Sequence, residues 1–206
     1  PPDALERLLH LGRQAFHAYA HRPLVRRLWW PRFEQAARWY LERERERRPT
    51  LAALMVEVEG ELPLEAPGGP FLLKARADRI ERAHDDRLTV IDYKTGAPPK
   101  EAEVTSGRQP QLPLEALMVR EGAFRGIAPA EVEALWFWSI RGDAAGGVAE
   151  PLKQDPARLA ASAAEGLMSL IEHYDDVAVG YPARLRPDMS LPRDYDHLAR
   201  FKEWAG

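Results

Sequence analysis

Cysteine is absent from the 206 residues of this sequence, which excludes disulfide bonds and any zinc or iron–sulfur site with cysteine ligands. No apolar run approaches the roughly 20 residues that a transmembrane helix needs, and no signal-peptide pattern opens the chain. Walker loops, G-x-G-x-x-G and G-x-S-x-G are missing as well. The absence of cysteine is consistent with a cytoplasmic setting, and without a spanning run we expect no membrane contact. Because the first residue is Pro1 rather than methionine, we expect a fragment of a longer chain.

An excess of positive charge is also lacking. The net charge is −3 and the isoelectric point is near 6.1, which argues against a stand-alone protein that binds nucleic acid by bulk electrostatic attraction. The composition is 45% hydrophobic and 30% charged, as in ordinary globular proteins. A chain of this length can bury one good core, so we expect one domain with appendages.

The most informative stretch begins at Phe71 and reads F-L-L-K-A-R-A-D-R-I-E-R, a polar turn, and then R-L-T-V-I-D-Y-K-T-G. Alternating apolar and polar residues, with many branched and aromatic side chains, predict two strands. His84-Asp85-Asp86 supplies the turn between them. We therefore expect an antiparallel hairpin with Asp78 on its first strand and Asp92 on its second.

Three charged side chains meet on one face of this hairpin. Asp92 and Lys94 are two residues apart and therefore project from the same face of a strand, and Asp78 can join them across the ladder. Carboxylate oxygens can hold Mg²⁺ or Mn²⁺, and a lysine can position or deprotonate a water bound by the metal. A plain cross-strand salt bridge, worth about 0.2–1 kcal/mol, is the alternative reading of D-x-K alone.

The remaining pattern predicts helices over residues 3–48, interrupted at Pro23, a half-buried strand over 54–64, a helix after Gln111, a strand over 131–140 and a helix that Asp155 caps. This order predicts an α/β fold with a mixed central sheet flanked by helices. We expect a helical N-terminal segment (1–50) packed on a core (51–178), and an extended tail with a short helix (179–206).

Three motifs in order resemble the RecB-like branch of the PD-(D/E)XK (restriction-endonuclease-like) nuclease superfamily. They are A-R-A-D-R-I-E at 75–81, V-I-D-Y-K-T-G at 90–96 and Q-L-P-L-E at 111–115. Ala75 replaces the usual glycine, and Glu115 replaces the tyrosine that accompanies the motif's glutamine at DNA. The chain also resembles, over essentially its whole length, the C-terminal part of the AddB family in its alphaproteobacterial form. The segments that carry this resemblance are W-P-R-F (30–33), the Q-L-P-L-E-A run and D-Y-D-H-L-A-R (194–200).

The resemblance implies hydrolysis of DNA phosphodiesters by Asp78, Asp92, Lys94 and Gln111 as catalytic residues. Asp78 and Asp92 would ligate Mg²⁺ or Mn²⁺, with the Tyr93 backbone carbonyl as a further ligand. The iron–sulfur cluster of some relatives is excluded because there is no cysteine. The family's histidine on an early helix has no match at the usual spacing among His10, His17 and His21, so the resemblance implies that it lies upstream.

Other residues are weaker candidates. An acid often precedes the first aspartate in the family, and Glu57 is the candidate for this ligand, with Glu59 as the alternative. Solvated strand faces explain both equally well. Arg76, Arg79, Arg108 and Gln111 are candidate DNA contacts, although Arg79 should lie on the face opposite Asp78.

Taken together, the resemblance implies an exonuclease domain of a helicase–nuclease complex that processes double-strand DNA ends for recombinational repair. DNA and an AddA-like partner subunit are the implied partners. The alternative is a non-catalytic scaffold or DNA-channel domain on the same fold, which the acidic isoelectric point and Glu115 favour.

Overall fold

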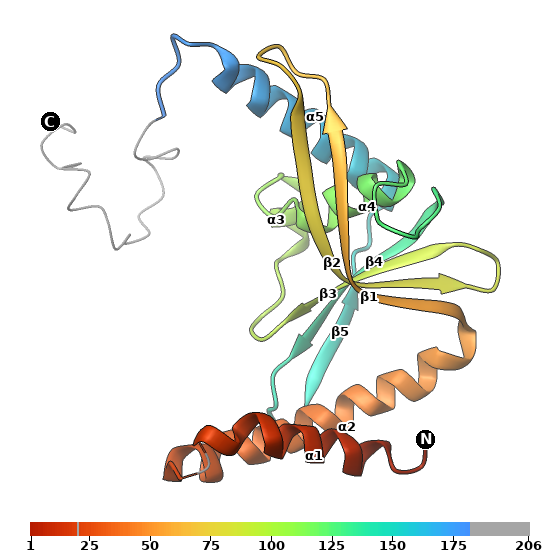
Figure 1. Cartoon of the computed structure of the whole chain (residues 1–206), viewed down its shortest axis with the longest axis vertical. Helices are drawn as coiled ribbons and strands as arrows, with labels where there is room; N and C mark the ends of the chain where they lie inside the picture. The colour runs from red at the N-terminus through yellow and green to blue at the C-terminus, as the bar shows by residue number, and fades with distance from the viewer. Residues whose placement is uncertain (20, 182–206) are drawn as a thin grey trace, which may run out of the picture.

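A five-stranded mixed sheet organises the part of the chain that the computed structural model describes, residues 1–19 and 21–181 (Figure 1). Its strands lie in chain order, with β1 antiparallel to β2, β2 antiparallel to β3, β3 parallel to β4 and β4 antiparallel to β5. The bounds are β1 Leu51–Leu64, β2 Phe71–Ala83, β3 Leu88–Lys94, β4 Val132–Ile140 and β5 Gly147–Pro151. The predicted mixed α/β fold is confirmed.

Three helices cover one face of the sheet. The crossover between the parallel strands β3 and β4 contains α3 (Glu101–Thr105) and α4 (Gln111–Arg120), and α5 (Pro156–Asp175) packs on α4. The Asp155 carboxylate accepts hydrogen bonds from the N–H groups of Ala157 and Arg158, so the predicted cap of α5 is confirmed. The main core lies between these helices and the sheet, with members such as Ile80, Val90 and Leu112 fully buried.

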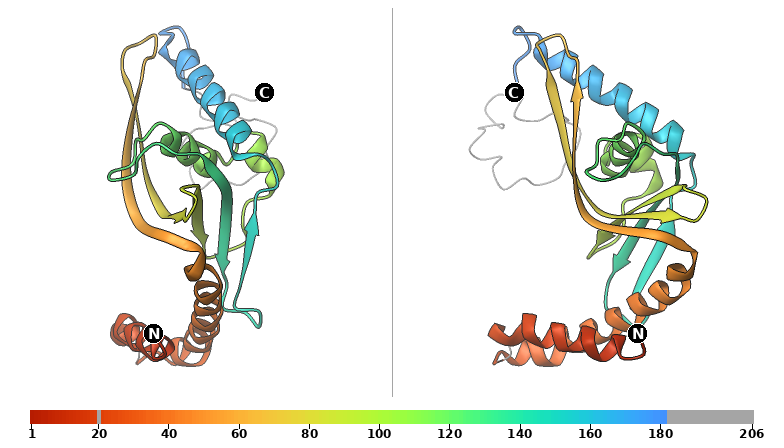
Figure 2. Two further views of the ribbon diagram at one scale, coloured as in Figure 1. Left: turned by 90° about the vertical axis from the view of Figure 1, so that its right-hand side faces the viewer. Right: turned by 45° about the vertical axis from the view of Figure 1, so that its right-hand side comes forward.

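The N-terminal helices lie at the end of the molecule away from α5 (Figure 2). They are α1 (Ala4–Phe16), the 3₁₀ turn η1 (His17–Tyr19), the π-helical turn η2 (Val25–Trp29), α2 (Trp30–Arg47) and the 3₁₀ turn η3 (Arg48–Thr50). The helix α2 packs on the other face of the sheet, and along it the Trp39 and Tyr40 rings contact the Trp138 ring of β4, with centroids 5.8 Å and 6.1 Å apart. None of the described helices is long and apolar enough to cross a membrane.

The buried face of the β1–β2 hairpin changes in the middle of both strands. Val56 and Glu57 are both exposed, which breaks the alternation of β1, and Glu57 has a φ of 54°. Such a positive φ is uncommon for a residue with a Cβ atom and marks a local distortion. Glu57 stands between the pairs Val56–Arg79 and Val58–Ala77, and is therefore opposite Asp78. The hairpin thus bends at the first predicted site residue.

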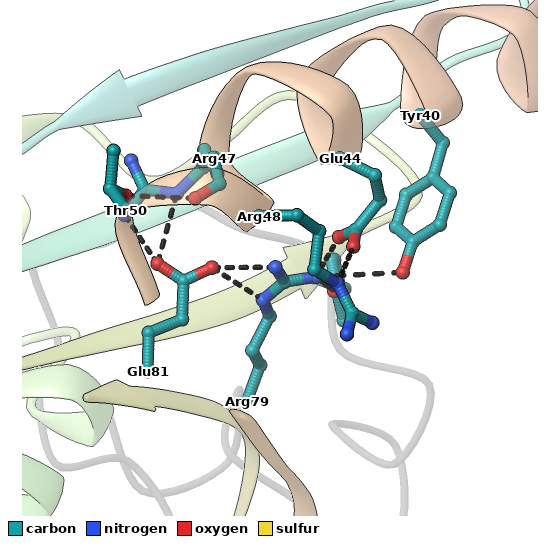
Figure 3. A network of polar contacts seen from close by, with 8 residues as sticks. Tyr40, Glu44, Arg47, Arg48, Thr50, Arg79 and Glu81 are labelled. Carbon is teal, nitrogen blue, oxygen red and sulfur yellow. Dashed lines mark hydrogen bonds and ion pairs between the residues drawn. The ribbon is translucent and has the colours of Figure 1, made fainter. Parts of the chain in front are cut away.

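A buried ionic network fastens α2 to the sheet (Figure 3). The Arg79 guanidinium is fully buried, donates to Glu81 Oε1 over 2.8 Å and to the Tyr93 hydroxyl over 3.1 Å, and pairs with Glu44 of α2. Arg47 Nε donates to the other Glu81 oxygen over 2.9 Å. Burial opposes the charge on Glu44, but hydrogen bonds from Arg48 and Arg79 hold the pKa of its carboxyl below the ordinary value.

Two details of the fold escaped the sequence reading. Gly147–Pro151 forms the edge strand β5, which the sequence pattern does not predict. The segment after Pro23 was expected as a simple helix break, whereas Val25–Trp29 continues into α2 as a π-helical turn. The short helix expected in the tail, and the D-Y-D-H-L-A-R segment, lie outside the described residues.

The network predicts a large stability loss when its central cation is removed. Arg79→Met keeps the side-chain volume but leaves the buried carboxylates of Glu44 and Glu81 without a full set of partners, so we expect a loss of about 3–5 kcal/mol in urea unfolding. Arg87→Met, which removes the exposed pairs with Asp85 and Glu133, is the control and should cost about 1 kcal/mol or less. Equal losses in the two variants would contradict this account of the network.

Candidate active site

The site begins where β2 and β3 part. Their backbone pairing runs from Arg82–Leu88 to Arg79–Ile91 and stops there. Beyond that point the Asp78 side chain replaces the backbone as acceptor, and its Oδ2 accepts a hydrogen bond of 2.9 Å from the backbone N–H of Tyr93. This bond holds the carboxylate of Asp78 beside the residue that follows Asp92.

The predicted proximity of Asp92 and Lys94 is confirmed. Lys94 Nζ lies 2.8 Å from Asp92 Oδ2, and the Lys94 ammonium also lies 5.9 Å from the centre of the Phe137 ring. The Asp92 side chain is only 3% exposed, whereas that of Lys94 is 31% exposed. The lysine therefore links a buried carboxylate to the solvent edge of the site, where a substrate can reach it.

The N-terminal half of α4 supplies two further polar side chains. Lys94 Nζ donates to Gln111 Oε1 over 3.2 Å, and Gln111 Nε2 donates to Glu115 Oε1 over 3.1 Å. Because an ammonium group can only donate, Gln111 must offer its oxygen to Lys94, and its amide nitrogen is left for Glu115. Glu115 is 2% exposed and lies one helical turn from Gln111, so it closes the inner end of the site.

Burial controls the charge of the two innermost acids. Removal from water raises the pKa of Asp92, partly offset by the Lys94 ammonium and reinforced by the nearby charge of Asp78. Removal from water likewise raises the pKa of Glu115 to about 7, against a hydrogen bond from Gln111 and with further repulsion from Asp92 and Asp78. The site thus concentrates negative charge that a cation would stabilise.

The turn after Lys94 is held by β4. Ser139, which pairs with Lys94 in the parallel ladder, is fully buried and its hydroxyl donates to the Gly96 carbonyl. Arg141 Nε in turn donates to Ser139 Oγ over 3.0 Å. These bonds fix the Thr95-Gly96 turn and, through it, the end of the strand that presents Lys94.

The other predicted residues occupy separate places. Arg76 forms an exposed ion pair with Glu57, and both side chains are more than half exposed. Arg108 is exposed in the loop before α4, with its Nε 3.2 Å from Ser106 Oγ. Arg79 is fully buried in the network beneath the sheet, where it cannot reach a nucleic acid bound beside Asp92. Its place on the face opposite the acids agrees with the strand alternation.

The donor set can be tested against a divalent metal ion. Among the described residues no three His, Cys, Asp or Glu side chains are grouped to cage an ion. Asp92 Oδ2 and Glu115 Oε2, however, are buried and accept no well-aligned hydrogen bond, even though the Lys94 ammonium is close to the former. Buried oxygens without donors favour a cation. Mg²⁺ often uses one or two carboxylates together with water and substrate phosphate, so Asp92 with the neighbouring Asp78 or Glu115 fits such an ion.

Comparison with known proteins agrees with this geometry. Residues 1–186 match the sequence model of the PD-(D/E)XK nuclease superfamily. This chain belongs to that superfamily. Members of the superfamily generally hydrolyse phosphodiester bonds, and the mixed α/β sheet flanked by helices is consistent with their fold.

The chain is also similar to curated bacterial proteins of greater length. A protein of Rickettsia bellii is 30% identical over 122 residues, which are 59% of this chain and 15% of that protein, and one of Rickettsia typhi is 29% identical over 122 residues, 59% of this chain and 14% of its own. Both are described as uncharacterized. The crystal structure of SSO0001 aligns with a TM-score of 0.37 and 18% identity, covering 81% of this chain and 73% of that one.

Glu115 is the site residue that the sequence reading missed. It was noted only as a substitute for the motif's tyrosine, yet it lies within hydrogen-bond distance of Gln111 and its pKa responds to Asp92 and Asp78. The signal was present in the spacing, since residues four apart lie on the same face of a helix. What the spacing does not reveal is that this face of α4 is buried.

The raised pKa of Glu115 predicts a pH-dependent stability difference. The folded protein keeps a proton on Glu115 between pH 4.5 and about 7 that the unfolded chain has lost, so this contribution to stability is complete below pH 4.5 and is lost as the pH rises through 7. Glu115→Gln cannot ionise. The free energy of unfolding of the variant, relative to that of the wild type, should therefore rise by about 3 kcal/mol between pH 4.5 and pH 8.

Urea unfolding of both proteins in EDTA at pH 4.5, 6 and 8 measures this difference. A stability gap between variant and wild type that stays constant over the whole pH range would show that Glu115 ionises normally.

Proposed function

We propose that this chain is a divalent-metal-dependent deoxyribonuclease that hydrolyses phosphodiester bonds at the site of Asp78, Asp92 and Lys94. The observation that carries the proposal is the buried Asp92 carboxylate with Lys94 Nζ at 2.8 Å, beside Asp78 at the point where β2 and β3 part. A plain surface salt bridge, the alternative interpretation of D-x-K, would leave its carboxylate exposed and would not raise the pKa of that carboxylate.

Each residue has a role that its position supports. Asp78 and Asp92 would hold the metal ion, and a bound ion would supply charge stabilisation at the phosphate and lower the pKa of a water molecule. Lys94, partly exposed and oriented by Gln111 and Asp92, would hold the attacking water in line with the scissile bond and accept its proton when neutral. The water oxygen bonds to phosphorus as the bond to the leaving sugar oxygen breaks.

The wider setting follows from the resemblance to the AddB family. We propose that the domain acts as an exonuclease in a helicase–nuclease complex with an AddA-like subunit, processing double-strand ends for repair. Two observations support this setting. The curated relatives extend far beyond the matched 122 residues, which are about 15% of their length. The net charge of −3 suits a domain that receives DNA from a larger assembly. In this proposal residues 51–178 are the nuclease core.

Cleavage should depend on Lys94. With end-labelled linear DNA and Mg²⁺ or Mn²⁺, we expect Lys94→Ala to lower the cleavage rate about 10²–10⁴-fold, the usual cost of losing a positioned acid–base group. Lys153→Ala, at an exposed lysine before α5, is the matched control and should cleave like the wild type. Equal cleavage by wild type and Lys94→Ala would refute the proposal. Absence of cleavage by the wild type with either ion, alone and with a helicase subunit, would favour the scaffold alternative.

Metal binding should be visible without DNA. If Asp92 holds the ion, Mn²⁺ raises the melting temperature of the wild type. The free energy of unfolding should rise by about 2.7 kcal/mol when the Mn²⁺ concentration is a hundred times the dissociation constant. Asp92→Asn should abolish this rise. Asp86→Asn, in the exposed turn between β2 and β3 where φ is 66° and asparagine is tolerated, should keep it. A rise of equal size in all three proteins would place the ion elsewhere.

A further inference from the structure

The N-terminal helices carry a charge opposite to that of the rest of the chain. We define the basic arm as residues 1–19 and 21–32. It contains six arginines and two carboxylates, a net charge of +4 in a chain whose total is −3, so the remainder carries −7. The arginines of the basic arm are Arg7, Arg13, Arg22, Arg26, Arg27 and Arg32, and all of them are exposed.

These arginines are not neutralised by nearby acids. Within the described residues, none of the six lies in an ion pair, whereas most other arginines do, including Arg47, Arg79 and Arg125. An unpaired guanidinium group on the surface is available to an anionic ligand. The basic arm therefore offers its positive charge to a binding partner, and the acidic remainder of the domain does not.

Exposed rings and apolar side chains lie among the arginines. Tyr19 is 50% exposed and Trp29 is 51% exposed, and leucines 11, 24 and 28 are also exposed. Arg22 lies over the Tyr19 ring at 5.4 Å, which pairs a cation with a stacking surface. The Phe16 ring meets Trp29 edge-on at 6.4 Å and helps to hold it in place. Arginine with exposed aromatic rings is the composition of surfaces that bind single-stranded nucleic acid.

The basic arm adjoins the edge of the sheet at which the candidate active site opens. Gly142, two residues after the end of β4, lies so close to the Arg32 backbone that a Cβ atom there would collide with it. From that point a short chain of contacts leads through Arg141 and Ser139 to Gly96, just after Lys94. Figures 1 and 2 show the arm below the end of β4. A strand leaving the site in this direction would meet the arm.

We propose that the basic arm binds single-stranded DNA on its way to or from the active site, with phosphates held by the arginines and bases stacked on Tyr19 and Trp29. The inference rests on the proposed function, which supplies DNA as the ligand. Charge decides between occupants: a polyanion complements the arm, whereas a second copy of the same +4 surface would be repelled.

Binding can be measured without cleavage, as fluorescence anisotropy of a labelled 20-nucleotide oligothymidylate in EDTA. We expect Arg26→Gln/Arg27→Gln to weaken binding about tenfold or more, and to reduce the slope of log affinity against log salt by about 1.4, as expected for two lost phosphate contacts on a single strand. Arg120→Gln/Arg125→Gln removes the same charge outside the arm and should bind within about twofold of the wild type. Unchanged melting temperatures establish that the variants fold.

The ring contribution has its own pair of variants. Tyr19→Ala should weaken binding of the single strand at least about fivefold and that of a 20-base-pair duplex much less, because only unpaired bases can stack. Tyr19→Phe, which keeps the ring, should bind like the wild type.

Three results would overturn the inference. The first is that the Arg26/Arg27 and Arg120/Arg125 double variants weaken binding equally. The second is that neither the Arg26/Arg27 variant nor Tyr19→Ala changes binding. The third is that polyglutamate competes as effectively as DNA, which would make the arm a docking surface for an acidic protein. The cleavage assay separates this inference from the proposed function. Wild type that binds through the arm but never cleaves refutes the nuclease alone, and cleavage with arm-independent binding refutes the arm alone.

Discussion

The hydrogen bond from the Tyr93 N–H to the Asp78 carboxylate is the contact on which the site depends. It forms where the β2–β3 ladder ends, and it replaces a backbone partner with a side chain that carries negative charge. The bend at Glu57 of β1, opposite Asp78, lies where β2 turns away from β3. Without the strand divergence, Asp78 and Asp92 would be the next pair of a closed ladder.

The two faces of β3 divide the work. Tyr93 packs against Trp138 and shares the buried Arg79 network with α2, whereas Asp92 and Lys94 project from the opposite face toward α4. One face is therefore fixed by aromatic and ionic contacts, while on the other the carboxylates outnumber the single Lys94 ammonium. A rigid support of this kind keeps the charged groups in place at a site whose carboxylates repel each other.

Much of this arrangement could be predicted from the sequence because it follows from local periodicity. Strand alternation places Asp92 with Lys94 and Arg79 on the other side, and both placements are confirmed. The rest depends on tertiary contacts that leave no local pattern. The burial of Glu115 requires α4 to pack against β3, and the short edge strand at Gly147 depends on β4 beside it. The roles of the charged residues in catalysis remain predictions.

The most direct test of the central claim is a crystal of the domain with a short DNA strand and Mn²⁺, with diffraction data collected at the manganese absorption edge. We predict an anomalous peak between Asp78 and Asp92, with a phosphate of the strand beside it and Lys94 in reach. A peak elsewhere, or DNA bound away from these residues with no peak between them, would contradict the account.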